Sequence, residues 1–259
     1  MPNWSETVIK LFVRPQHAHF AKDIIASLAT PGMDTSDLET QAAEDSRNVW
    51  LDLEALLPIP AGLQQAQEIP EYEALVSGNG RGASNRGERA PTESHRRAMD
   101  LFNSNMAAYG VATAYDWQRN RWGTKWNATG SAPRVEDADD HDAYHEFQGA
   151  TMITYRITTP WCEPGGYLSV LRDQCERRGI GLRVWVSHED GGTKWNPDAE
   201  EYQTVWEELD TYNVDLEDMA SSDMLVIAGQ GLRFEPSDVA SQPLGEPDPL
   251  ERILRDHTR

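Results

Sequence analysis

The sequence is poor in several residue types, and each shortage narrows the classes of protein to consider. Its 259 residues include only two cysteines, Cys162 and Cys175, which suits a reducing compartment and makes a disulfide framework unnecessary. No apolar run approaches the roughly eighteen residues of a membrane-spanning helix, and the first residues lack the basic and apolar regions of a secretory signal. We therefore expect a cytoplasmic protein with a polar surface.

Cationic residues are scarce. The chain has 23 Lys and Arg against 43 Asp and Glu, a formal net charge of −20. Residues 1–130 contain 12 cationic and 16 acidic residues, whereas residues 131–259 contain 11 and 27, so the second half carries most of the excess acid. This charge disfavours nucleic-acid binding, which depends on Lys and Arg displacing counterions, and it favours basic partners. Solubility alone is the other explanation for the charge.

Signatures of common active sites are also missing. Neither of the two glycine-containing segments, 77–82 and 228–231, has the lysine, hydroxyl and following helix that a phosphate-binding loop needs. Cys175 falls on an apolar helical stripe and should be inert, while Cys162 lies in a turn with no base nearby in sequence. We therefore predict no catalytic residue and no cofactor.

The hydrophobic pattern alternates between strands and helices. It predicts strands at 7–13, 48–57, 124–128, 151–159, 181–187 and 224–228, and helices at 16–30, 166–178 and 199–220. A long helix is expected from Thr92 or Ser94 to about Trp122, with Gly110 able to kink or split it. The order predicts an α+β protein with a ferredoxin-like split βαβ antiparallel sheet.

Less regular stretches set the predicted domain organisation. Residues 77–92 are rich in Gly, Ser, Asn and Arg and are expected to form a loop, and residues 135–146 are an acidic excursion. We predict a single ferredoxin-like domain at 1–229 with a helical insertion at about 61–121. A loosely attached C-terminal extension follows at 230–259.

Four segments of the sequence are distinctive in composition and order: MPNW at 1–4, LDLEALLPIP at 51–60, YDWQRNRWGTKWNA at 115–128 and ITTPWCEP at 157–164. Together they resemble the YubB ferredoxin-like domain family of phage and conjugative-plasmid proteins. The resemblance covers residues 1 to about 190. The chain departs from the family in having Ser5 where cysteine is common, and in its acidic insertion after Ala128. The resemblance implies a mobile-element context and no assigned activity.

The most unusual motif is the pentapeptide GTKWN, which occurs at 123–127 and again at 192–196. In the structural interpretation, Trp117, Trp122 and Trp126 pack a helix end onto the sheet. In the functional interpretation, polar groups between aromatic walls form a ligand pocket. The residues of that predicted ligand site are Trp122, Lys125, Trp126, Asn127, Lys194 and Asn196.

The acidic excursion contains His141 and His145, four residues apart, beside several carboxylates. On a helix these imidazoles would share a face, as metal ligands do, but the pair lacks the glutamate that metalloprotease chemistry uses as a base. We therefore predict no metal site. The excursion is also predicted to form an acidic surface that binds a basic partner. The residues of this surface are Glu136, Asp137, Asp139, Asp140 and Asp142.

Three functions remain as hypotheses. The first is a non-enzymatic accessory protein of a phage or mobile element. It would bind a basic host protein, such as a defence complex, by DNA-like acidic mimicry. The second is a small-molecule or nucleotide binder, or sponge, that uses the GTKWN segments. The third is a metal-dependent enzyme with its metal at His141 and His145.

Overall fold

A computed structural model describes residues 3–35, 49–76, 92–140, 146–189, 193–196, 201–215 and 233–238. The chain divides into two compact units. The first comprises Met1–Pro58 and Arg121–Ser237, and the second comprises Ile59–Asn120 and Asp238–Arg259. Helices and an antiparallel sheet occur together, so the protein belongs to the α+β class.

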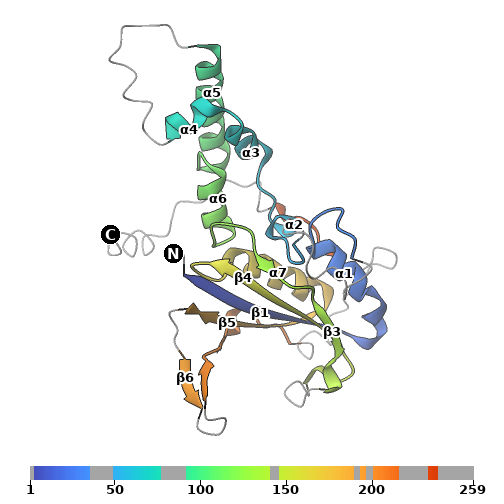
Figure 1. Cartoon of the computed structure of the whole chain (residues 1–259). Helices are drawn as coiled ribbons and strands as arrows, with labels where there is room; N and C mark the ends of the chain where they lie inside the picture. Colours follow the sequence, from blue (N-terminus) through green and yellow to red (C-terminus); the bar gives the residue numbers. More distant parts are fainter. Residues whose placement is uncertain are drawn as a thin grey trace. The chain divides into compact units, whose positions relative to one another are not determined.

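The N-terminal strand β1 (Trp4–Val13) lies at the centre of the sheet of the first unit (Figure 1). It pairs antiparallel with β4 (Thr151–Pro160) on one side and with β5 (Gly181–His188) on the other. Since both neighbours run against β1, they are parallel to each other. Helix α7 (Gly165–Arg178) connects them, so β4, α7 and β5 form a βαβ unit with β1 inserted between its strands.

Short strands form the edges of the sheet. On one side, β2 (Thr129–Gly130) and β3 (Arg134–Asp137) both pair antiparallel with β4. On the other, β8 (Glu207–Glu208) pairs with β5. Strands β6 (Thr193–Asn196) and β7 (Glu201–Thr204) form a separate two-stranded sheet. Every pairing among these strands is antiparallel.

Alternation along β1 sends successive side chains to opposite faces of the sheet. The apolar face is covered by α7, which lies behind the strands in Figure 1, and α1 (Ala21–Leu28) buries Ile24, Ile25 and Leu28. The central apolar side chains of these strands and helices are each at most 2% exposed: Ile9, Leu11, Ile24, Ile25, Leu28, Ile153, Ile157, Leu168, Leu171, Leu182 and Val184. This burial accounts for most of the hydrophobic stabilisation of the unit.

The opposite face is covered at one end by the segment that follows β3. The Phe147 ring stacks on Phe12 of β1, with centroids 3.8 Å apart, and both side chains are buried with Ala138, Ala150 and Met152. The predicted acidic excursion is therefore anchored to the sheet by apolar side chains at both of its ends.

Residues 233–238, which fall in the predicted C-terminal extension, bind to α7. The Gln174 side chain donates to the Glu235 carbonyl (2.7 Å) and accepts from the Glu235 amide (3.1 Å). Phe234 is buried, and the Arg178 guanidinium lies 5.3 Å from its ring. These contacts fix the short segment against the first unit.

The second unit is helical. It contains α3 (Ala61–Gln67), α4 (Pro70–Val76), α5 (Glu93–Tyr109) and most of α6 (Ala114–Arg121). Thr92 caps α5 by accepting from the His95 amide, and Gly110 ends it at φ 74°. The prediction that Gly110 splits the long helix is therefore confirmed, because a residue in the left-handed region ends a helix.

Three predicted elements are wrong. The strand expected at 48–57 contains helix α2 (Leu53–Leu56), whose N-terminus is capped by the Asp52 side chain. The strand expected at 124–128 forms bends, and β2 begins at Thr129. The helix expected at 199–220 contains β7, β8 and a 3₁₀ turn at Asp210–Tyr212. The strand expected at 224–228 lies outside the described residues.

Gly166 provides a test of the packing in the first unit. A Cβ at this position would collide with the Arg121 carbonyl oxygen, which is backbone and cannot rotate away. We expect Gly166→Ala to lower the free energy of unfolding by about 1–3 kcal/mol, as measured by chemical denaturation. Ser169→Ala on the same helix is the control. An equal effect of the two substitutions would contradict the close approach.

Candidate functional site

The first GTKWN segment follows α6, and its aromatic neighbour Trp122 is buried. The indole Nε1 of Trp122 donates a hydrogen bond of 2.8 Å to the Leu57 carbonyl. Thr124, also buried, donates to the Pro160 carbonyl. These two residues fasten the segment to the sheet and to the end of α2, as expected for a buried tryptophan with a satisfied N–H group. Trp122 therefore serves packing, and no surface for a ligand remains on it.

Asn127 is also structural. Its Oδ1 accepts from the amides of Leu53 and Ala128, both at 2.9 Å, and its Nδ2 donates to Asp52 Oδ1 at 2.7 Å. The first turn of a helix has amides with no partner inside the helix, so Asn127 supplements the Asp52 cap of α2. The amide of Asn127 is thus committed to the fold.

Lys125 and Trp126, in contrast, reach the surface. The Trp126 side chain is 53% exposed. The Lys125 ammonium lies 2.9 Å from the centroid of the Trp161 ring, a cation–π contact. Of the six predicted ligand-site residues, these two occupy a surface that another molecule could reach.

Trp161 was not predicted as a site residue. It is 53% exposed and is held at φ 79°, where residues other than glycine are uncommon. Its amide donates to the Asn3 carbonyl at 2.7 Å, and the adjacent pair Trp4 and Pro160 brings a further tryptophan, 40% exposed, to this end of the sheet. The sequence feature that could have identified Trp161 is the proline-flanked TTPWCEP turn, in which an aromatic residue follows the end of a strand.

The second GTKWN segment has a different local structure. Residues 193–196 form β6, with Lys194 opposite Gln203 and Asn196 opposite Glu201, whereas residues 123–126 form bends with Gly123 at φ 87°. Only the backbone of Lys194 and Asn196 is described, so their part in a ligand site stays a prediction. The identical pentapeptide therefore does not repeat one local structure.

The predicted acidic surface lies at a sheet edge. Glu136 and Asp137 belong to β3, whose four side chains are all exposed, and they pair in register with Met152 and Thr151. Asp139 is also exposed and accepts a 2.6 Å hydrogen bond from the Gly149 amide. Asp140 closes the 3₁₀ turn that follows β3. Asp142 lies outside the described residues.

Three other carboxylates of the second half are grouped around one guanidinium. The Arg183 side chain, 14% exposed, pairs with Glu146 at 3.5 Å, with Glu208 at 3.8 Å and with Asp215. Its guanidinium also lies 5.0 Å from the Phe147 ring. Glu208 belongs to β8 at the opposite edge of the sheet, so exposed carboxylates occur at both edges among the described residues.

The two cysteines have different surroundings among the described residues. The Cys162 thiol donates to the Gly123 carbonyl at 2.8 Å. Nearby, His188 Nε2 lies 3.6 Å from the Glu163 carboxylate, a pair that the sequence did not suggest. Cys175 is fully buried, and burial raises the pKa of its thiol, so at neutral pH it remains protonated.

Neither histidine of the predicted metal pair, His141 or His145, lies among the described residues. Within the described ranges, no three His, Cys, Asp or Glu side chains are grouped so that they could hold a metal ion. None of the helices described combines the length and the apolar character needed to cross a bilayer.

Comparison of the chain with protein-family models, with curated proteins and with solved structures finds no match. The site must therefore be interpreted from its own geometry.

The contrast between Asn127 and Trp126 can be measured. We expect Asn127→Ala to lower the free energy of unfolding by about 1–3 kcal/mol, because it removes the hydrogen bonds that Asn127 makes with the Leu53 amide and the Asp52 carboxylate. Trp126→Ala removes an exposed side chain and should change the free energy of unfolding by less than about 0.5 kcal/mol. Thermal and urea denaturation of both variants provide the measurement, and a reversed order would contradict the structural role of Asn127.

The two thiols should also differ in reactivity. In the native protein at neutral pH, we expect a maleimide to label Cys162, which is partly exposed, and to leave Cys175 unlabelled. Unfolding in denaturant should expose both thiols. Intact-mass spectrometry counts the labels, and rapid labelling of Cys175 in the folded state would show that its helix does not pack as described.

Proposed function

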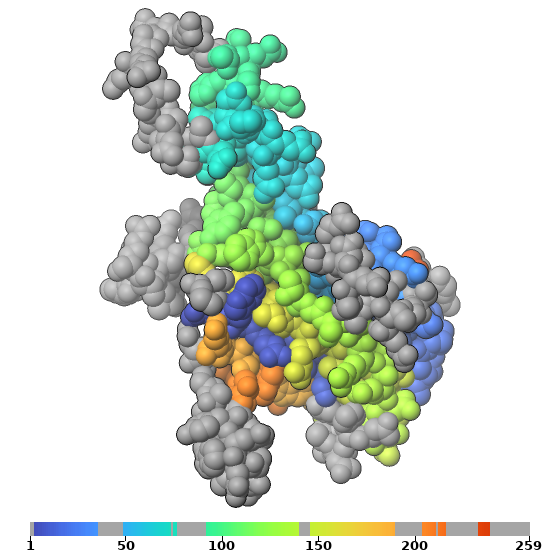
Figure 2. Space-filling model, viewed as in Figure 1, coloured from blue at the N-terminus to red at the C-terminus, as the bar shows by residue number. Residues whose placement is uncertain are grey.

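We propose that this protein is a non-enzymatic binding protein that docks a basic segment of another protein along the β2–β3 edge of its sheet. The observation that carries the proposal is the course of residues 126–139. They run along β4 and place exposed Trp126 at one end and exposed Glu136, Asp137 and Asp139 at the other. In Figure 2 the yellow-green residues of this region lie on the surface.

The register of the sheet supports this arrangement. Strand β2 pairs with Thr158 and Ile157, and β3 pairs with residues 154 to 151, so both short strands lie on the same side of β4. Ten residues of β4 extend over about 30 Å at 3.3 Å per residue. That length matches an extended peptide segment of similar size.

An edge strand offers backbone groups to a further strand, and its charges select which strand can pair. Within the described residues, β3 pairs with β4 alone. Carboxylates at this edge repel a second copy of this chain, whose net charge is −20, and attract a segment that carries Lys or Arg. The same charges therefore oppose self-association and favour a basic partner.

The exposed tryptophans supply the apolar part of the surface. Trp126 and Trp161 are each 53% exposed, and tryptophan is enriched among the residues that dominate binding energy at protein interfaces. The carboxylates would then accelerate encounter and the tryptophans would slow dissociation. This division of roles does not require catalysis.

The broader context is proposed on the resemblance noted above. It supports a ferredoxin-like assignment, to which the order of β4, β1 and β5 around α7 also corresponds. It further supports an accessory role in a phage or mobile element, with a host defence complex that binds DNA as the expected class of partner. Acidic side chains at the edge would occupy the basic DNA-binding surface of that partner.

The second candidate function is binding of a nucleotide or other small molecule, which is favoured by the contact between Lys125 and Trp161. A base that stacks on Trp161 would have to displace the Lys125 ammonium from the ring, where it lies 2.9 Å from the centroid. This displacement opposes stacking, so we place the protein partner first.

The test uses a fluorescent peptide of alternating Lys and Val as the probe, with a peptide of alternating Glu and Val as its counterpart. We expect the Lys peptide to bind, with an affinity that falls as the salt concentration rises, because exposed charges are screened. The variant Glu136→Gln/Asp137→Asn should bind about fivefold to tenfold more weakly. Fluorescence anisotropy measures both affinities.

A matched control distinguishes the effect of the carboxylates at the β2–β3 edge from the effect of the total net charge. Glu68→Gln/Asp100→Asn removes the same charge from exposed positions of the second unit and should leave peptide binding unchanged. Equal weakening by both variants would show that only the total charge matters. Stronger binding of a nucleoside triphosphate than of the Lys peptide would favour the second candidate.

A further inference from the structure

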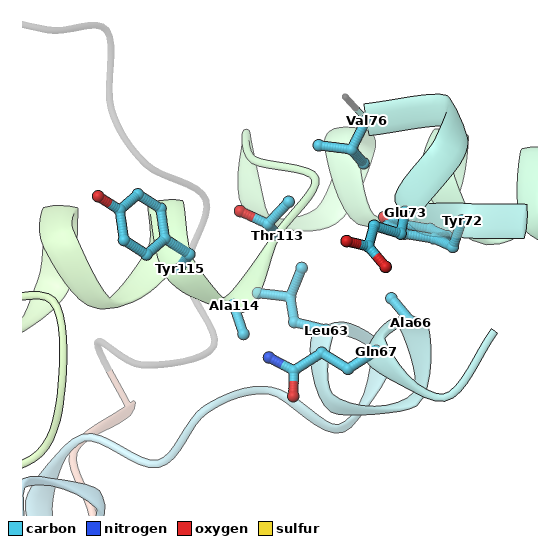
Figure 3. A pocket seen from close by; sticks show the side chains of 9 residues that line it. All are labelled: Leu63, Ala66, Gln67, Tyr72, Glu73, Val76, Thr113, Ala114 and Tyr115. Atoms are coloured by element: carbon cyan, nitrogen blue, oxygen red, sulfur yellow. The ribbon is translucent and has the colours of Figure 1, made fainter. Parts of the chain in front are cut away.

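The second unit contains a cleft that none of the predicted functions uses. Its volume is about 320 Å³, and it lies between α3, α4 and the start of α6 (Figure 3). Leu63, Ala66, Val76 and Ala114 supply apolar walls, and the Glu73 carboxylate points into the space between them. Clefts of about 300–1,000 Å³ with apolar walls and few polar groups are typical of small-molecule sites.

A buried polar network fixes two of these helices to α5. Asn105 of α5 donates to the Gly62 carbonyl of α3 at 3.1 Å and to the Tyr72 hydroxyl of α4 at 3.2 Å. The Tyr72 hydroxyl donates in turn to the Ala112 carbonyl at 2.5 Å, next to the third wall. Because satisfied buried networks are rigid, the cleft keeps its shape without a ligand.

The network depends on a close approach of two helices. A Cβ at Gly62 would lie 2.6 Å from Asn105 Oδ1, so only glycine allows Asn105 to reach the α3 backbone here. Tyr72 and Asn105 are both at most 3% exposed. Burying an amide and a phenol costs free energy unless both are hydrogen-bonded, and here each has its partners.

The charges around the cleft indicate the ligand. Glu73 provides one carboxylate at the mouth, where it is exposed, and Gln67 provides a neutral amide. Tyr115 also belongs to the lining, but its ring points away from Leu63, Ala66 and Glu73, and the Arg119 guanidinium lies 5.8 Å from its centroid (Figure 3). A molecule with an apolar body and one positive group would match the apolar walls and the Glu73 carboxylate.

We propose that this cleft binds a small organic ammonium compound, with its ring or alkyl body against Leu63, Ala66 and Ala114 and its ammonium group at Glu73. The site is separate from the β3 edge, since its lining residues all belong to the second unit. The volume is at the small end of the range for ligand sites, so a single-ring amine is the expected size.

The test titrates the full-length protein with 2-phenylethylamine and follows methyl resonances by NMR. We expect the Ala66 and Ala114 methyl signals to shift and saturate at a millimolar concentration of the amine, as is usual for so small a probe. The isosteric neutral alcohol 2-phenylethanol should bind about tenfold more weakly, and phenylacetate should bind least, because both lack the charge that Glu73 attracts. Equal shifts with all three compounds would overturn the proposed specificity.

Two variants locate the site. Glu73→Gln should bind the amine about as weakly as the alcohol, with no change in binding of the alcohol itself. Gln67→Trp places a large ring in the mouth and should abolish binding, whereas Gln65→Trp, on the same helix but outside the lining, should not. Circular dichroism confirms that each variant is folded. Unchanged binding in folded Gln67→Trp, or no methyl shift with the native chain, would refute the proposal.

Discussion

The pairing of β1 on both sides holds the first unit together. Strands β4 and β5 are joined by α7 but are not adjacent in the sheet, so the hydrogen bonds that unite them run through a strand from the beginning of the chain. The helix-facing side chains Ile9 and Leu11 of β1 then complete the core. Because the central strands are paired on both sides, the backbone groups open to a partner are those of the short outer strands.

The net charge of the chain does not describe how its charges are grouped. Arg183 gathers Glu146, Glu208 and Asp215 around one mostly buried guanidinium, beside the ring of Phe147. The single guanidinium offsets only one of these three negative charges. Glu136 and Asp137 of β3 differ because their strand is at the edge and its side chains are all exposed.

The two units use polar groups in different ways. In the first, Asn127 and Asp52 satisfy the start of a short helix, and the tryptophans that are not buried reach the surface at one end of the sheet. In the second, Asn105 and Tyr72 fix helices around a cleft. In both cases a side-chain amide is hydrogen-bonded within the fold, so the recognition surfaces are formed by the residues around it.

The sequence by itself determined the three long strands, the α1 and α7 helices and the helix ends at Gly110 and Gly179, because alternation, helical spacing and left-handed glycines are local signals. Only the tertiary structure decided that Asn127 caps a helix whose first residue, Leu53, lies 74 positions earlier, and that GTKWN bends at one site and forms a strand at the other. The exposure of Trp161 and the grouping of three carboxylates around Arg183 were also decided by the tertiary structure. These features depend on partners distant in sequence, which no local pattern contains.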